Sequence, residues 1–136
     1  MSIMGWLYIL FTLGIINGFI GMTSVRKFIE TYSSIDSWPT FNKFKEMVRL
    51  QMYQALVQIA VLGPMLIIGI WGTYRGTISG ANFAIWLMLN GGILGVGLIA
   101  KKYEESVRSL RVLDPNLEEQ YRKVCHSWLH KPFPDF

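Results

Sequence analysis

The sequence predicts an all-α integral membrane protein with three transmembrane helices, an outer N-terminus, an inner C-terminus and amphipathic helices on the cytoplasmic side. Two observations carry this prediction. Only 16 % of the 136 residues are charged, against about 25 % in an average soluble domain. The charges also leave three long gaps, because residues 1–25, 50–74 and 76–100 contain no Lys, Arg, Asp or Glu. This distribution excludes an ordinary soluble domain, a disordered tail and a disulfide-stapled secreted module.

Each uncharged stretch has the length of one membrane crossing. A helix of about 25 residues reaches roughly 37 Å, and the hydrocarbon core of a bilayer is about 30 Å thick. We therefore expect transmembrane helices over residues 1–22, 52–73 and 81–100, with a cytoplasmic-side loop over residues 23–51 and a short outer turn over residues 74–80. Three buried helices of a soluble bundle are disfavoured, because the remaining residues could not cover them.

The first predicted helix carries a stripe of small and polar residues. It begins without Lys or Arg and lacks an A-x-A-like site, so we expect it to stay as a span and not to be cleaved as a signal peptide. One face carries Gly14, Asn17, Gly18 and Gly21. Gly14 and Gly18 form a G-x-x-x-G motif, which lets two membrane helices approach closely.

The loop over residues 23–51 is predicted to form two helical segments. The first continues the helical pattern to Tyr32, and the break at residues 33–37 ends it. Pro39 suits the first turn of a new helix, whose apolar stripe is Phe41, Phe44 and Val48. Basic residues on its other side are typical of a helix at the membrane interface. No breaker follows, so residues 40–73 are predicted to form one long helix.

The second and third predicted spans also carry polar or small stripes. Gln54 and Gln58 lie on one face of the second span, and Pro64 in its middle predicts a kink. The third span contains Asn90 and a second close-approach pair, Gly91 and Gly95. These stripes either pack against each other in a three-helix bundle, or face another protein, or line a pore.

The tail over residues 101–136 reads as an extension of the third span followed by a separate helix. Residues 101–112 continue the third span, and Asp114 with Pro115 begins the last helix. Its apolar face consists of Leu117, Tyr121, Val124 and Trp128. We expect this face to dock on the protein's own loop helix, on the membrane surface or on a partner subunit.

The basic residues predict the orientation. The loop holds five of them, the tail holds seven, and the short turn between the second and third spans holds only Arg75. Cytoplasmic segments carry the excess of Lys and Arg, so loop and tail are placed on the cytoplasmic or stromal side of a plasma, inner or organellar membrane. Acidic residues interleave with the basic ones, which disfavours a nucleic-acid partner.

The predicted spans contain no Asp, Glu, Lys, Arg or His, which disfavours pumps, ion-coupled carriers and voltage sensors. His126 and His130 are spaced i,i+4 and could share a metal ion, but two histidines fall short of the four ligands of a closed zinc site. No catalytic motif is present. The sequence therefore predicts no catalytic residue, no cofactor and no enzymatic activity.

Three hypotheses follow for the function. The first is a non-enzymatic accessory or scaffold subunit, which packs against other membrane protein subunits through its small-residue faces and its tail helix. The second is a small homo-oligomeric channel lined by neutral polar residues such as Gln54 and Gln58. The third is a membrane-anchored metal- or cofactor-binding protein that uses His126 and His130.

Overall fold

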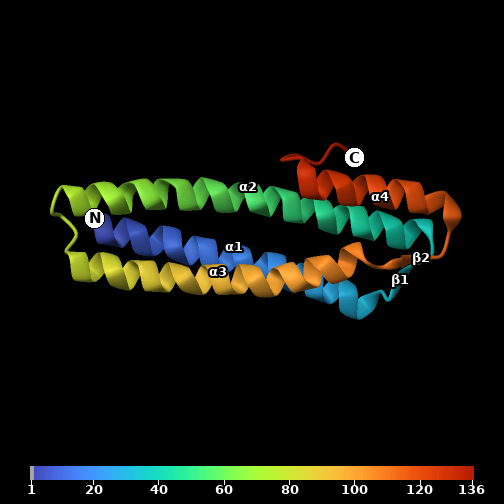
Figure 1. The fold of residues 1–136 in the computed structure, drawn as a ribbon, viewed down its shortest axis with the longest axis horizontal. Helices are drawn as coiled ribbons and strands as arrows, with labels where there is room; N and C mark the ends of the chain where they lie inside the picture. The colour runs from blue at the N-terminus through green and yellow to red at the C-terminus, as the bar shows by residue number, and fades with distance from the viewer. Residues whose placement is uncertain (1) are drawn as a thin grey trace.

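The computed structural model describes residues 2–136 and is almost entirely helical (Figure 1). Its elements, in chain order, are α1 (Ile3–Thr31), β1 (Ser34–Ile35), α2 (Trp38–Tyr74), α3 (Gly80–Arg108), β2 (Arg111–Val112) and α4 (Pro115–His130). α1, α2 and α3 are each long and apolar enough to cross a membrane. The prediction of three such helices is confirmed.

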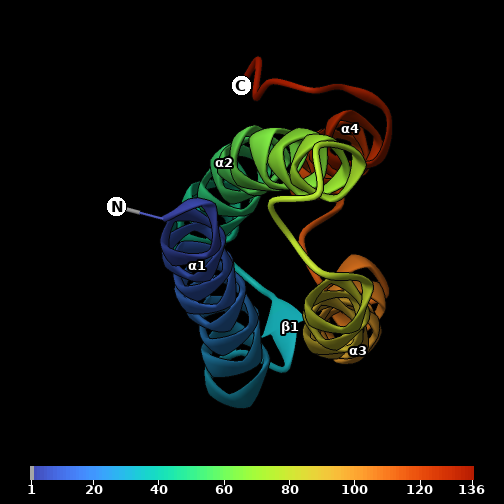
Figure 2. The same cartoon turned by 90° about the vertical axis from the view of Figure 1, so that its left-hand side faces the viewer.

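The three long helices run side by side, and α4 lies along the N-terminal half of α2 (Figure 1). Viewed along their length, they form three separate columns (Figure 2). One end of the molecule, which we call the hairpin end, holds the turn between α2 and α3. The other end, which we call the α4 end, holds β1, β2 and α4.

The helix boundaries follow from local sequence chemistry. The Ser2 side chain accepts a hydrogen bond from Gly5 N at the start of α1, and Asp114 accepts one from Asn116 N at the start of α4. Both are the oxygen-bearing side chains that satisfy free backbone donors at a helix start. Gly76 in the hairpin turn has φ +72°, a backbone conformation that glycine adopts without a steric penalty.

One long helix has the predicted extent, and another ends earlier than predicted. α2 is one continuous helix that includes both the predicted loop helix and the second span, as expected, and it continues through Pro64. The third span was predicted to continue to Val112, but α3 ends at Arg108. The residues after it form β2, which pairs in parallel with β1. The chain segments that follow α1 and α3 lie beside each other, so their backbone N–H and C=O groups form hydrogen bonds with one another.

Two hydrophobic clusters hold the helices together, one at each end. The cluster at the α4 end joins α1, β1, α2, α3 and α4 through Val25, Phe28, Ile35, Phe41, Phe44, Met47, Val48, Met52, Val107, Leu117, Tyr121 and Val124. The cluster at the hairpin end is smaller and consists of Leu7, Met65, Ile78 and Trp86. Between them the helices meet through small and polar residues, which is where the candidate site lies.

Candidate functional site

Amide side chains hold α1 and α2 together in the middle of the bundle. Asn17 Nδ2 donates to the Gln54 carbonyl oxygen at 3.0 Å and to Gln58 Oε1 at 2.9 Å. Gln51 Nε2 donates to the Gly21 carbonyl oxygen at 2.8 Å. Within a bilayer no water competes for these groups, so interhelical hydrogen bonds fix how the two helices face each other.

Two glycines of α1 permit this close approach. A Cβ added at Gly14 would lie 3.2 Å from Gln58 Nε2, and one added at Gly21 would lie 2.9 Å from Gln54 Oε1. Gly18 lies between them, and an added Cβ there would meet no described atom within 4 Å. Gly18 instead lines an open space.

That space is a cavity of about 540 Å³ between α1, α2 and α3. Its polar lining consists of the amides of Asn17, Gln51, Gln54 and Gln58, with Glu104 on α3. The rest is apolar or glycine: Gly14, Ile15, Gly18, Phe19, Gly21, Met22, Ala55, Leu89, Gly92, Ile93, Val96, Gly97 and Ala100. The volume lies within the range of about 300–1,000 Å³ that is usual for small-molecule sites.

The cavity exists because α3 packs on α1 but approaches α2 only near its two ends. Trp86 and Val107 are the buried residues of α3. They are 21 residues apart, or about 31 Å along a helix. Trp86 packs against Gly69 of α2, where an added Cβ would lie 3.1 Å from the indole, and Val107 belongs to the cluster at the α4 end. Between these two contacts α3 stands away from α2, with the cavity on its inner face.

Two buried donors in this region have no hydrogen-bond partner among residues 2–136, namely Gln58 Nε2 and Trp86 Nε1. Gln58 lines the cavity. An unpaired buried donor costs about 1–3 kcal/mol. Gln58 Nε2 lies against α1, 3.2 Å from a Cβ added at Gly14, so its lost hydrogen bond is a cost of the close approach of the two helices.

The small and polar residues predicted on the third span lie elsewhere. Asn90 Nδ2 donates to the Trp86 carbonyl oxygen of its own helix at 2.7 Å. An added Cβ at Gly91 or Gly95 would meet nothing within 4 Å in the part of the chain that the structure describes. On a helical wheel this pair lies roughly 150° from the cavity-lining face of α3. The structure thus brings Gly14, Asn17, Gly21, Gln54 and Gln58 together and leaves Gly91 and Gly95 apart.

The apolar residues of the tail helix pack on α2. Leu117, Tyr121 and Val124 are buried in the cluster at the α4 end, and Trp128 is partly buried against it. The Phe44 and Tyr121 rings lie 4.9 Å apart. Tyr121 Oη donates to the Val107 carbonyl oxygen, and burial raises the pKa of Tyr121 above its usual value. Of the three docking surfaces considered for this helix, the structure shows the protein's own α2.

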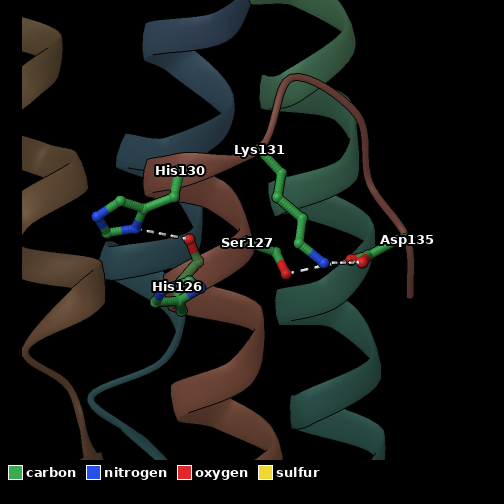
Figure 3. Close-up of polar contacts among 5 residues, drawn as sticks. All are labelled: His126, Ser127, His130, Lys131 and Asp135. Atoms are coloured by element: carbon green, nitrogen blue, oxygen red, sulfur yellow. Dashed lines mark hydrogen bonds and ion pairs between the residues drawn. The ribbon is translucent and has the colours of Figure 1, made fainter.

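His126 and His130 stack with their ring centroids 4.4 Å apart, on the side of α4 shown in Figure 3. His130 Nδ1 lies 3.1 Å from the His126 carbonyl oxygen. Nearby, Asp135 accepts hydrogen bonds from Ser127 and Lys131 and so ties the C-terminal segment to α4. In residues 2–136 no three His, Cys, Asp or Glu side chains are grouped so that they could hold a metal ion. The two histidines thus lack a third protein ligand.

The fold and the cavity define the class: an all-helical chain with three helices long and apolar enough to cross a membrane, and with a partly open, amide-lined cavity between them. No protein-family model, no curated protein and no solved structure matches the chain with significant similarity. The function must therefore be inferred from the geometry.

The sequence pattern indicates the amides that line the cavity. It does not indicate that α3 forms the third side of the cavity. Gly92, Gly97 and Glu104 line it from α3. A signal for this wall was present, since Ile93, Gly97, Ala100 and Glu104 recur at intervals of three and four and so share one helix face. The charge of Glu104 placed it outside the predicted span, which hid its relation to that face.

Proposed function

We propose that this chain is a non-enzymatic accessory or scaffold subunit of a larger membrane protein complex, with the α4 end on the cytoplasmic or stromal side. The orientation rests on the basic residues, since five lie between positions 23 and 51 and seven lie after position 100. Such an excess marks the cytoplasmic side of a membrane. The hairpin turn, with Arg75 alone, then faces the opposite side.

The observation that carries the function is the open glycine face of α3. Gly91 and Gly95 are one turn apart, and neither would bring an added Cβ within 4 Å of any described atom. A helix facing only lipid gains nothing from such a surface, whereas a partner helix gains close backbone approach. We infer that a transmembrane helix of another subunit packs there.

The packing of the tail supports the same function. α4 is fastened to α2 by buried apolar residues, so the α4 end forms a rigid body that a partner can dock against. The channel hypothesis has less support. The Gln51, Gln54 and Gln58 side chains line a space inside the chain, and two of them bond to α1, whereas a pore between copies would need them on the outer surface.

The test is purification of the full chain in a mild detergent, in parallel with the double variant Gly91→Leu/Gly95→Leu. We expect other membrane proteins to co-purify at constant stoichiometry with the wild type and to be lost from the double variant, because leucine keeps the helices apart. Gly63→Leu is the matched control, since Gly63 on α2 also has open surroundings. A pure homo-oligomer that conducts ions in liposomes, with flux abolished by Gln58→Leu, would instead establish the channel.

A further inference from the structure

We propose that the cavity between α1, α2 and α3 binds one uncharged, lipid-soluble molecule that carries carbonyl or hydroxyl oxygens at one end of an apolar tail. This site is separate from the partner surface at Gly91 and Gly95, which lies on the opposite face of α3. Neither proposal depends on the other.

The arrangement of the amides sets the polar end of the ligand. Gln51, Gln54 and Gln58 recur every three or four residues, so they form a ladder about 10 Å long on one face of α2. Asn17 faces this ladder from α1. Side-chain amides both donate and accept hydrogen bonds, and Gln58 Nε2 still lacks an acceptor.

The charge of the site favours an uncharged ligand. The cavity has one ionisable lining residue, Glu104, at the α4 end. Its carboxylate already lies 3.8 Å from the Arg108 guanidinium. No unpaired charge therefore remains to select a cation or an anion, and taking a charged ligand into an apolar space without a partner is costly.

The shape of the site favours a tail. The α3 wall runs from Leu89 to Glu104, which is about 22 Å along a helix. Ile93 lies level with Gln58, since both approach a Cβ added at Gly14, and this wall is apolar or glycine from Leu89 to Ala100. A ligand whose oxygens face the amides of α2 would lay its apolar tail along the α3 wall.

The volume favours a small molecule over a helix as the occupant. One turn of a helix, about 10 Å wide with its side chains and 5.4 Å long, fills about 420 Å³. The cavity of about 540 Å³ thus holds little more than a single turn, whereas a partner helix would run past the whole wall. A small molecule fits, and it can enter between α2 and α3, which make few contacts with each other.

Two kinds of membrane molecule share this chemistry, an isoprenoid quinone and an uncharged acylglycerol. The experiment uses decylubiquinone and 1-oleoylglycerol as probes and dodecane as the tail without oxygens. Each is titrated into the full chain in detergent, and the unfolding midpoint is followed by tryptophan fluorescence. A ligand that binds the folded state raises this midpoint with concentration. We expect a saturable rise with one of the two oxygen-bearing probes, and the responding probe identifies the source.

The variants Gly18→Leu and Gly92→Leu fill the cavity from two different helices, and both positions have room for a side chain. We expect each to weaken the apparent affinity at least tenfold, and one suffices if the other does not fold. Gly63→Leu, at a glycine of α2 that has open surroundings and does not line the cavity, is the matched control and should bind as the wild type does. Three results would overturn the proposal: no shift with either probe, an equal shift with dodecane, or wild-type binding by the folded cavity variants.

Discussion

At the scale of single residues, the amides and glycines between α1 and α2 act as one unit. Gly21 leaves the space that Gln51 and Gln54 occupy, and Gln51 uses that space to bond to the Gly21 carbonyl oxygen. A larger side chain at position 21 would remove both the space and the hydrogen bond. The small residue and the polar residue are therefore useful only together.

Tyr121 gives a prediction about pH at the same scale. Burial raises its pKa above the ordinary value near 10, so the folded protein keeps the phenol protonated where the unfolded chain ionises it. The free energy of unfolding is then unaffected by this group below pH 10 and falls as the pH rises above 10. We expect the free energy of unfolding of Tyr121→Phe to decrease less steeply above pH 10 than that of the wild type.

Tyr121→Phe should also lower the free energy of unfolding by about 1 kcal/mol at neutral pH, because the hydrogen bond to the Val107 carbonyl oxygen is lost. Denaturant unfolding monitored between pH 7 and 11 would measure both effects. Tyr74→Phe is the control, since the Tyr74 side chain is 88 % exposed. An identical alkaline decline in the wild type and in Tyr121→Phe would contradict the role given to Tyr121.

At the scale of elements, α3 is distinctive because it packs extensively on α1 but makes few contacts with α2. Trp86 holds α3 against α2 at the hairpin end, with its indole against Gly69 and the Phe83 ring stacked beside it at a centroid distance of 5.5 Å. The spacing of α2 and α3 at the hairpin end therefore depends on this one side chain.

We predict that Trp86→Ala lowers the free energy of unfolding by about 3 kcal/mol, because it removes a large side chain that is 2 % exposed. Hydrogen exchange of α3 backbone amides should also accelerate most near position 86. Trp71→Ala, at a side chain that is 55 % exposed, should change stability by less than about 0.5 kcal/mol. Equal effects of the two substitutions would show that Trp86 does not fasten α3.

At the scale of the whole molecule, the two hydrophobic clusters differ in size. The cluster at the α4 end contains twelve buried residues, drawn from all four helices and from β1. The cluster at the hairpin end contains four buried residues. Most of the apolar surface of α1, α2 and α3 is left exposed. In a bilayer this surface meets lipid, so the bundle relies on the α4 end for much of its internal packing.

The proposed orientation predicts that the hairpin turn and the tail lie on opposite sides of the membrane. In a Cys125→Ala background, single cysteines introduced as Arg75→Cys and Lys131→Cys should react with a membrane-impermeant maleimide from opposite faces of sealed vesicles. Labelling of both from one face would contradict the orientation. The native Cys125 should react slowly, because burial raises the pKa of its thiol.

The sequence by itself determined the three long helices and most of their ends. Charges are excluded from a bilayer by their hydration energy, so the gaps in the charge pattern mark the spans whatever the helices pack against. Caps such as Asp114 act within a few residues, so they too can be recognised without tertiary information.

Tertiary structure alone decided which stripes meet. Gly14-x-x-x-Gly18 and Gly91-x-x-x-Gly95 are the same motif in sequence, yet Gly14 lies against Gln58 of α2 and Gly18 lines the cavity, whereas Gly91 and Gly95 do neither. The choice depends on how α3 is rotated, and that rotation is set by the distant contacts of Trp86 and Val107. The cavity could not be predicted from the sequence for the same reason. A space between helices depends on how the helices are placed relative to one another, and the pattern of a single helix does not show it.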